Sequence, residues 1–209
     1  MKLKPNDRIV FFGDSITEWG RDKTDFSSLG HGYVNHVSAY LAMTYPELDL
    51  TFFNRGIGGN KIHDLNERIN DCLDLQPDVV ILMIGINDTW HNAGSDISGT
   101  KEEAARFENE YRILLDKLTE SLVKRLFLIE PFVLHYPVDR ANWRDDLDKK
   151  IQIVRKMADT YDLEFLPIDG LLNEAARKKS PQYYTGDDGV HPTNAGAAFI
   201  AKEVIKRIH

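Results

Sequence analysis

The sequence predicts an α/β fold: a three-layer, doubly wound sheet of five parallel strands, in one domain over residues 1–209. Short apolar runs alternate with segments of helical period, which is typical of β/α units. One of these runs is apolar at every position, as expected for a strand covered on both faces. The 209 residues are 42% hydrophobic and contain no repeat, low-complexity tract or Pro/Gly-rich linker, so one packed domain is expected.

The strands are predicted from five runs rich in Val, Ile, Leu and Phe. They cover residues 8–12, 49–53, 78–84, 125–129 and 164–168. The run from Val79 to Ile84 presents no polar face to water, which indicates a central strand packed between two helical layers. The segments between the runs have helical period, so helices are expected on both faces of the sheet.

The helices are predicted where apolar residues recur with helical spacing. They cover residues 32–44, 61–73, 101–122, 143–161, 171–179 and 194–208. Thr100 and Glu103 have the spacing of a capping box at the start of the longest helix. Cys72 falls within a helical pattern, where a small buried side chain is expected.

Composition and charge exclude several classes of protein. No run of about 18 uncharged apolar residues is present, so neither a membrane-spanning helix nor a membrane partner is expected. The first residues lead into a short, strand-like apolar run rather than a signal peptide, which favours a cytoplasmic location. The formal net charge is -7 with acids and bases interleaved, so no nucleic-acid partner is expected. A single cysteine permits neither an internal disulfide nor a cysteine-based zinc site.

Polar residues follow three of the predicted strands, at the edge where doubly wound sheets bind ligands. They lie in residues 13–18, 54–60 and 85–90, and a fourth dense polar segment, residues 185–192, precedes the last helix. Because the carboxyl ends of parallel strands meet at one edge, we expect these four segments to converge. Serine, histidine, aspartate, asparagine and glycine residues are thereby brought to one place.

These residue types suit nucleophilic catalysis. A serine hydroxyl becomes a strong nucleophile when a histidine removes its proton, and a carboxylate orients that histidine. Ser15 directly follows a predicted strand and a glycine, while Asp188 and His191 are three residues apart across a glycine-containing turn. The backbone amides of Ser15 and Gly59 and the carboxamide of Asn87 are available to form an oxyanion hole, each at a strand end.

Four sequence phrases resemble the signature blocks of the SGNH (GDSL-type) hydrolases, in order and over essentially the full length. They are FGDSIT at 12–17, NRGIGG at 54–59, IGIND at 84–88 and DGVHP at 188–192. The resemblance implies a flavodoxin-like sheet, with Ser15 as nucleophile, His191 as general base and Asp188 as its orienting group. It also implies that Gly59 and Asn87 complete the oxyanion hole with the Ser15 amide. The residue at position 17 is threonine, so the G-x-S-x-G elbow of ordinary α/β-hydrolases is absent.

Further phrases resemble the acetylxylan-esterase branch of this family. They are LGHGYV at 29–34, YPEL at 45–48, MIGINDTW at 83–90 and PF at 131–132. This resemblance implies a serine esterase that removes short acyl groups, chiefly acetyl, from carbohydrate esters such as acetylated xylo-oligosaccharides, through an acyl-enzyme on Ser15. It also implies a small-molecule ester as the partner, no cofactor or metal, and assembly as a homo-oligomer.

Four further side chains are candidates for contacting the substrate. Asp14 adjoins the nucleophile, Trp19 and Trp90 follow two polar motifs with rings suited to stacking on a sugar, and Tyr184 precedes the fourth segment. Core packing is the alternative role for each aromatic residue, and an Asx hydrogen bond within its own turn is the alternative for Asp14. The remaining histidines considered have no ligand-like spacing and are interpreted as ordinary loop or helix residues: His31, His63, His91 and His135.

Other interpretations stay open. The glycines of residues 56–59 partly match a dinucleotide fingerprint but lack its third glycine and the following acid. Asp14, Asp188 and His191 are also residue types that ligate metals. A longer-chain acyl hydrolase, such as a lysophospholipase or thioesterase, would use the same serine mechanism. A noncatalytic flavodoxin-like module that binds a nucleotide or flavin phosphate is disfavoured, because Asp14 and Glu18 would repel the phosphate.

Overall fold

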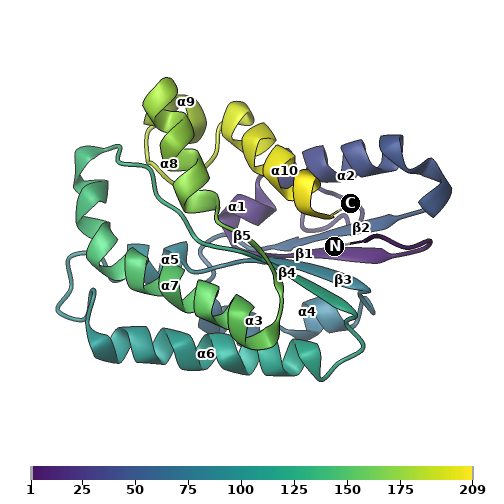
Figure 1. Ribbon diagram of the computed structural model, residues 1–209, viewed down its shortest axis with the longest axis horizontal. Helices are drawn as coiled ribbons and strands as arrows, with labels where there is room; N and C mark the ends of the chain where they lie inside the picture. Colours follow the sequence, from purple (N-terminus) through teal and green to yellow (C-terminus); the bar gives the residue numbers. More distant parts are fainter. Residues whose placement is uncertain (1, 209) are drawn as a thin grey trace.

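The computed structural model describes residues 2–208, which contain one parallel sheet with helices on both faces (Figure 1). The strands are β1 (Arg8–Gly13), β2 (Thr51–Gly56), β3 (Val79–Met83), β4 (Arg125–Ile129) and β5 (Glu164–Leu166). Their order is β2-β1-β3-β4-β5 with every neighbouring pair parallel, which confirms the predicted doubly wound, five-stranded sheet. The order reverses between β1 and β3, so the crevice of this topology lies at the carboxyl ends of these two strands.

The end of β1 is packed unusually tightly against its neighbours. Its last residue, Gly13, pairs with Gly56 of β2 on one side and Met83 of β3 on the other. A Cβ at Gly13 would lie 2.3 Å from the Met83 carbonyl oxygen, and a Cβ at Gly56 would lie 2.1 Å from the Glu18 backbone nitrogen. Glycine at both positions therefore lets the chain turn closely over the sheet immediately after β1.

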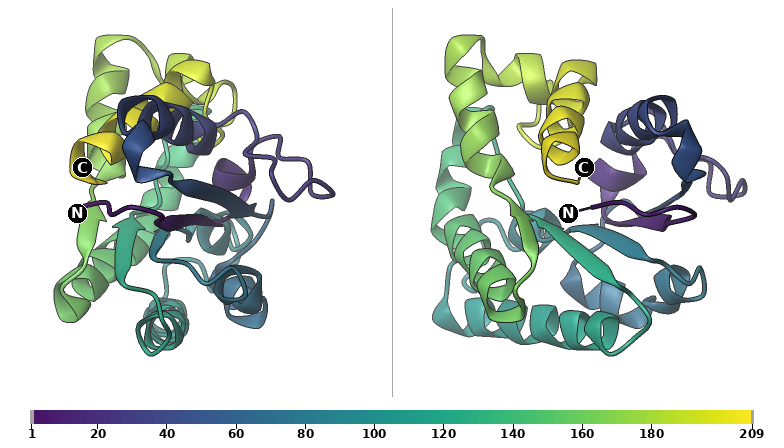
Figure 2. Two further views of the ribbon diagram at one scale, coloured as in Figure 1. Left: turned by 90° about the vertical axis from the view of Figure 1, so that its right-hand side faces the viewer. Right: turned by 45° about the vertical axis from the view of Figure 1, so that its right-hand side comes forward.

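The helices that cover the sheet form the two outer layers (Figures 1 and 2). They are α2 (Tyr33–Thr44), α3 (Ile62–Glu67), α4 (Asn70–Leu73), α6 (Lys101–Thr119), α7 (Arg144–Tyr161), α8 (Ile168–Lys178) and α10 (Asn194–Ile208). Helices α2, α8 and α10 cover one face of the sheet, and α3, α4 and α6 cover the other (Figure 1). Further helical turns lie in the connections: α1 (Ser15–Glu18), η1 (Pro46–Leu48), α5 (Ile86–Trp90), η2 (Val138–Trp143) and α9 (Pro181–Thr185).

Each face of the sheet has its own apolar core. Val79, Ile81 and Met83 of β3 belong to the core shared with α2, α8 and α10, whereas Val80 and Leu82 belong to the core shared with α3 and α6. This alternation explains why β3 is apolar at every position: both of its faces are removed from water. Helix α7 contributes to both cores, the first through its N-terminal half and the second through its C-terminal half.

Several element boundaries differ from the predicted ones. The helix predicted over 61–73 is divided into α3 and α4, because Arg68 leaves the helical conformation and donates to the carbonyls of Gly13 and Arg55. Strand β2 begins two residues late, after Asp49 adopts a left-handed conformation with φ 47°. Helix α6 ends at Thr119 and α8 begins at Ile168, each three residues earlier than expected. The short helices α1, α5 and α9 were not predicted.

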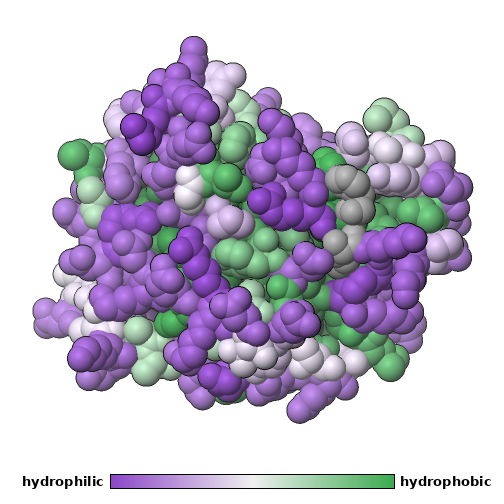
Figure 3. Space-filling view, viewed as in Figure 1, coloured by the Kyte–Doolittle hydropathy of each residue, from purple (hydrophilic) through white to green (hydrophobic). Residues whose placement is uncertain are grey.

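The surface seen in Figure 3 is mainly hydrophilic, with apolar side chains scattered between charged ones. No helix within residues 2–208 is both long enough and apolar enough to span a membrane. Large apolar side chains that are exposed, such as Phe26, Met43, Leu122 and Val138, come from separate parts of the chain.

Candidate active site

The four polar segments predicted to converge lie together beside the ends of β1 and β3. Ser15 begins α1 directly after β1, and its side chain contacts His191, which precedes α10. Asn87 lies in α5 after β3 and donates a 3.0 Å hydrogen bond to the carbonyl of Asn60, in the segment after β2. The sheet topology thus joins residues that are far apart in the sequence at one edge.

Ser15, His191 and Asp188 form a continuous chain of hydrogen bonds. The Ser15 Oγ lies 2.8 Å from His191 Nε2, and His191 Nδ1 lies 2.6 Å from Asp188 Oδ2. The other carboxylate oxygen, Asp188 Oδ1, accepts 2.8 Å bonds from the backbone N–H groups of Val190 and His191. Asp188 is therefore held by its own turn, and the histidine it orients is directed at the serine hydroxyl.

These contacts set the ionisation of the pair. The hydrogen bond with Asp188 raises the pKa of His191 above 6.5 against the effect of burial, and the charges of Asp188 and Asp14 add to the rise. Burial opposes ionisation of Asp188, but hydrogen bonds from His191 and Val190 hold its pKa below the ordinary value. Asp188 is therefore a carboxylate at neutral pH, ready to stabilise the imidazolium that forms when His191 takes a proton.

Two tryptophan rings lie beside the imidazole of His191. Trp19 stacks on it with a centroid separation of 5.4 Å and an interplanar angle of 19°, and Trp90 lies 5.8 Å away at 51°. Trp19 and Trp90, predicted as substrate-contacting residues, thus contact the base itself. The stacked ring of Trp19 covers one face of the imidazole, and the two contacts together restrict its rotation.

Arg140 supports this arrangement and was not predicted. Its guanidinium lies 4.2 Å from the centroid of the Trp143 ring and 5.4 Å from that of Trp90. Its Nε donates a 2.8 Å hydrogen bond to the carbonyl oxygen of Asp188. Arg140 therefore connects one of the tryptophans beside His191 to the turn that carries Asp188. No sequence pattern distinguishes it from the other charged residues around it.

The donors proposed for the oxyanion hole come from the segments after β1, β2 and β3. The Ser15 backbone N–H is at the first position of α1, where no preceding helical turn supplies an acceptor. Gly59 has φ +80°, a conformation that favours glycine, and an added Cβ there would meet no atom within 4 Å. Asn87 is buried, with 5% of its surface exposed. The adjacent Gly58 N–H donates to the Glu18 carboxylate, which anchors the Gly59 segment to α1.

Asn54 fixes α1 over the sheet. Its buried amide nitrogen donates to the carbonyls of Thr17 at 2.7 Å and Leu29 at 2.9 Å, while its oxygen accepts from the Gly56 N–H at 2.9 Å. The helix that begins with Ser15 is thereby tied to β2. Asn54 lies within a polar segment singled out in the sequence, but its role depends on a contact 37 residues away.

Asp14 lies at the start of α1, whereas Tyr184 packs against α10. Asp14 caps α1 by accepting the Ile16 N–H at 2.9 Å, and its other oxygen has no hydrogen-bond partner within residues 2–208. Burial raises the pKa of Asp14 to about 7. Tyr184 packs edge-on against Tyr183 and Phe199, with centroid separations of 5.0 and 5.8 Å. Asp14 thus makes the turn contact proposed as its alternative role, and Tyr184 packs at the start of α10.

The other histidines considered are at the surface. His31, His63, His91 and His135 are all exposed, and His63 pairs with Glu67 at 3.2 Å. Within residues 2–208 no three His, Cys, Asp or Glu side chains are grouped as metal ligands would be. Cys72 is buried, as its helical pattern predicted, and burial raises the pKa of its thiol to about 12.

Residues 11–199 match the model of the GDSL-like lipase/acylhydrolase family. This chain belongs to that family. It is therefore a carboxylic ester hydrolase, and the family predicted from the four sequence phrases is confirmed. The five-stranded parallel sheet with helices on both faces is the fold of the GDSL/SGNH hydrolases.

Similar proteins support the assignment. An acetylxylan esterase of Geobacillus stearothermophilus is 33% identical over an alignment 216 positions long, which covers 100% of this chain and 96% of that protein. The crystal structure of Axe2, an acetylxylan esterase from the same organism, matches with a TM-score of 0.84 and 31% identity, over 99% of this chain and 95% of that one. A putative GDSL-like lipase from Parabacteroides merdae matches with a TM-score of 0.89 and 33% identity, over 98% and 96% of the two chains.

Proposed function

We propose that this chain is a serine esterase that removes acetyl groups from carbohydrate esters such as acetylated xylo-oligosaccharides. The observation that carries the proposal is the hydrogen-bonded chain from Ser15 Oγ through His191 to Asp188. Catalytic mutants of Axe2 each lack one of a serine, an aspartate and a histidine. That aspartate precedes that histidine by three residues, the spacing of Asp188 and His191 here.

In the first half of the reaction, Ser15 Oγ attacks the carbonyl carbon of the ester and His191 Nε2 takes the hydroxyl proton. The carbonyl oxygen becomes negative and accepts hydrogen bonds from the Ser15 and Gly59 amides and the Asn87 carboxamide. The bond between the carbonyl carbon and the sugar oxygen then breaks. His191 gives its proton to that oxygen, so the sugar leaves as an alcohol and the acyl group stays on Ser15.

In the second half, water attacks the acyl-enzyme while His191 accepts one of its protons. The bond between the acyl carbon and Ser15 Oγ breaks, and the proton returns to Ser15. The product leaves as acetic acid and loses the second proton of the water to solvent, which gives acetate and restores the free enzyme. Asp188 keeps its negative charge throughout and stabilises the imidazolium in both halves.

One series of substrates tests both which acyl group the enzyme removes and which alcohol it releases. We expect p-nitrophenyl acetate to be hydrolysed much faster than the hexanoyl and octanoyl esters, and acetate to be released from acetylated xylosides. One methylene changes transition-state binding by about 1 to 3 kcal/mol, so a pocket closed after acetyl gives a steep drop by the hexanoyl ester. Equal rates for acetyl and octanoyl esters, with no acetate from the xylosides, would instead indicate a lysophospholipase- or thioesterase-like enzyme.

Two controls accompany this series. Activity abolished by EDTA and restored by a divalent metal would contradict a purely serine mechanism. Self-association is part of the proposal, on the resemblance to the esterase branch, and light scattering tests it. A solution mass equal to the 23.9 kDa of the single chain would contradict the homo-oligomer.

A further inference from the structure

A second carboxylate beside the site, that of Asp88, takes no part in the proposed reaction. It follows Asn87 in α5 and is completely buried. Its Oδ2 accepts the backbone N–H of Ile62 at 3.0 Å, and its Oδ1 accepts from the Arg106 guanidinium at 3.0 Å. Ile62 begins α3, directly after the segment that carries Gly59. Asp88 therefore joins the segments after β2 and β3 without touching Ser15 or His191.

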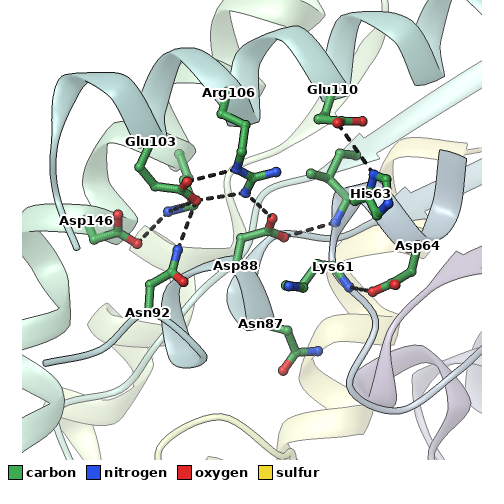
Figure 4. Close-up of polar contacts among 12 residues, drawn as sticks. Lys61, His63, Asp64, Asn87, Asp88, Asn92, Glu103, Arg106, Glu110 and Asp146 are labelled. Carbon is green, nitrogen blue, oxygen red and sulfur yellow. Dashed lines mark hydrogen bonds and ion pairs between the residues drawn. The ribbon is translucent and has the colours of Figure 1, made fainter. Parts of the chain in front are cut away.

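Asn87 and Asp88 each form a hydrogen bond with the backbone of the short segment that follows Gly59. Asn87 Nδ2 donates to the Asn60 carbonyl, and Asp88 accepts the Ile62 N–H two residues further on. In Figure 4 the two side chains leave α5 in different directions, with Asp88 directed at Arg106 and Asn87 directed away from it. Gly59 lies immediately before these two contacts. The distance from the Gly59 amide to the Asn87 carboxamide is thus constrained by the Asp88 contact.

Asp88 is itself fixed by side chains of α6. Arg106 donates to both oxygens of Glu103, at 2.8 and 2.7 Å, and Glu103 also accepts from Asn92 at 3.0 Å. Lys150, completely buried in α7, lies 3.9 Å from the same Glu103 carboxylate. Figure 4 shows Arg106 and Glu103 on one side of Asp88 and Lys61, which follows the Gly59 segment, on the other. Both oxygens of the Asp88 carboxylate accept hydrogen bonds, and the Arg106 guanidinium that donates one of them is itself held by Glu103. The Asp88 carboxylate therefore has little freedom to move.

We propose that Asp88, braced by Arg106, is a positioning residue that sets the separation of the Gly59 and Asn87 donors of the oxyanion hole. The inference rests on the proposed function. Both donors act on the negative oxygen that develops only in the transition state. A change in their separation therefore lowers kcat while leaving KM nearly unchanged.

The variant Asp88→Asn tests this inference because it keeps the side-chain shape. The amide retains one acceptor oxygen and presents an NH2 group to either Ile62 N–H or Arg106, so one contact is lost. With p-nitrophenyl acetate we expect kcat to fall about 30-fold and KM to change less than about threefold. In an Asn87→Ala background we expect Asp88→Asn to lower kcat no more than about fivefold, because one of the two donors it positions is already absent.

Glu130→Gln is the matched control. Glu130 is also completely buried, accepts one backbone N–H, from Asp169, and pairs with an arginine, Arg155, whose side-chain exposure of 39% equals that of Arg106. It has no contact with the Gly59 segment in the hydrogen bonds described for residues 2–208. We expect this variant to lower the melting temperature with a kcat within about twofold of the wild type, since it leaves the oxyanion-hole donors in place.

Three outcomes overturn the inference. The first is a kcat of Asp88→Asn equal to that of the wild type, and the second is the same factor of kcat loss from Asp88→Asn in the wild-type and Asn87→Ala backgrounds. The third is a kcat loss in Glu130→Gln as large as that in Asp88→Asn. If Asp88→Asn does not fold, Arg106→Gln replaces it in the same double-mutant cycle, since Arg106 is partly exposed. We expect Arg106→Gln to lower kcat about fivefold, with the same dependence on Asn87. A wild-type protein that hydrolyses no acetyl ester would contradict the proposed function, whereas an active wild type with multiplicative losses contradicts this inference alone.

Discussion

At the scale of single residues, the proposed site combines local and distant contacts. Asp188 and His191 are joined through a turn of their own, whereas the bond between Ser15 and His191 links residues 176 positions apart. The histidine also contacts the rings of Trp19 and Trp90. Reactivity at Ser15 therefore depends on a base whose orientation is set by three neighbouring side chains, and substitutions there should change rate more than stability.

The Ser15→Ala substitution should abolish ester hydrolysis and leave the fold intact. The hydroxyl contributes one hydrogen bond, to His191, and no core packing. Loss of a serine nucleophile costs on the order of 10⁶ in kcat. Circular dichroism and denaturant titration check the fold, and labelling of the wild type, but not the variant, by a fluorophosphonate checks the nucleophile. Turnover above about a tenth of the wild-type value would exclude Ser15 from that role.

The pH dependence of kcat/KM should follow the ionisation of His191. Only the neutral imidazole can accept the Ser15 proton, and the pKa of His191 is raised above 6.5 chiefly by its bond with Asp188. Activity is therefore expected to fall as the pH decreases through a value above 6.5. In Asp188→Asn the rate should be low and the midpoint should move to lower pH, because the main cause of the raised pKa is removed. A rate that is flat from pH 5 to 9 would contradict a histidine base.

At the scale of elements, hydrogen bonds of side chains near the helix ends decide where α6 begins and where α3 ends. Thr100 caps α6 by accepting the Glu103 N–H at 3.2 Å, as predicted. The return contact of a capping box is replaced, because the Glu103 carboxylate binds Arg106 and Asn92. Arg68 likewise ends α3 and donates to Gly13 and Arg55. Charged side chains near these helix ends thus position the loops around the site.

The contact of α1 with β2 predicts a strong effect of Gly56→Ala. The added Cβ would lie 2.1 Å from the Glu18 backbone nitrogen, so α1 must move, and Ser15 with it. We expect the free energy of unfolding to fall by about 1 to 3 kcal/mol and kcat to fall at least about tenfold. Chemical denaturation and steady-state kinetics measure the two effects.

Gly170→Ala is the control for this substitution. Gly170 lies inside α8, where an added Cβ meets no atom within 4 Å. Alanine is the better helix former, so the variant should be more stable by about 0.5 to 1 kcal/mol, with unchanged kcat. Equal behaviour of the two variants would mean that the α1 contact does not limit the position of Ser15.

At the scale of the whole molecule, the sheet separates two apolar cores, and polar groups are buried where loops and helices meet at its carboxyl edge. Lys150 is completely buried beside the carboxylates of Asp146 and Glu103. Burial opposes ionisation of Asp146, but the hydrogen bond and charge of Lys150 hold its pKa below the ordinary value. Asp146 is therefore a carboxylate in the interior and depends on the neighbouring Lys150 ammonium group.

Lys150→Met should destabilise the protein strongly. The methionine fills a similar volume but leaves Asp146 buried without its cation, which costs about 3 to 5 kcal/mol. The exposed pair of Lys178 with Glu174 gives the control: Lys178→Met should change the free energy of unfolding by less than about 1 kcal/mol. Urea titrations of both variants provide the comparison. Similar small losses for the two would show that the buried charge of Lys150 contributes little.

The fold class followed from sequence alone because its signals are local. Alternation of apolar runs with helical segments predicts β/α units, and the wholly apolar run of β3 predicts burial on both faces. The parallel topology then places the ends of the first three strands together. This topology and the four sequence phrases together predict the same set of site residues: Ser15, Gly59, Asn87, Asp188 and His191. The prediction needs only residue types and spacing, because these decide which side chains can act as nucleophile, base or hydrogen-bond donor.

The supporting contacts were decided only by the tertiary structure. Arg140 with Asp188, Asn54 with α1, and Arg106 with Asp88 join residues whose separation in the sequence has no periodicity. The one-turn helices α1 and α5 are too short to be stable alone and form because the loops around them are packed in place. Such contacts form only where the fold brings distant parts of the chain together. A sequence pattern reports the residues within one element, whereas the position of one element beside another is a property of the packed fold.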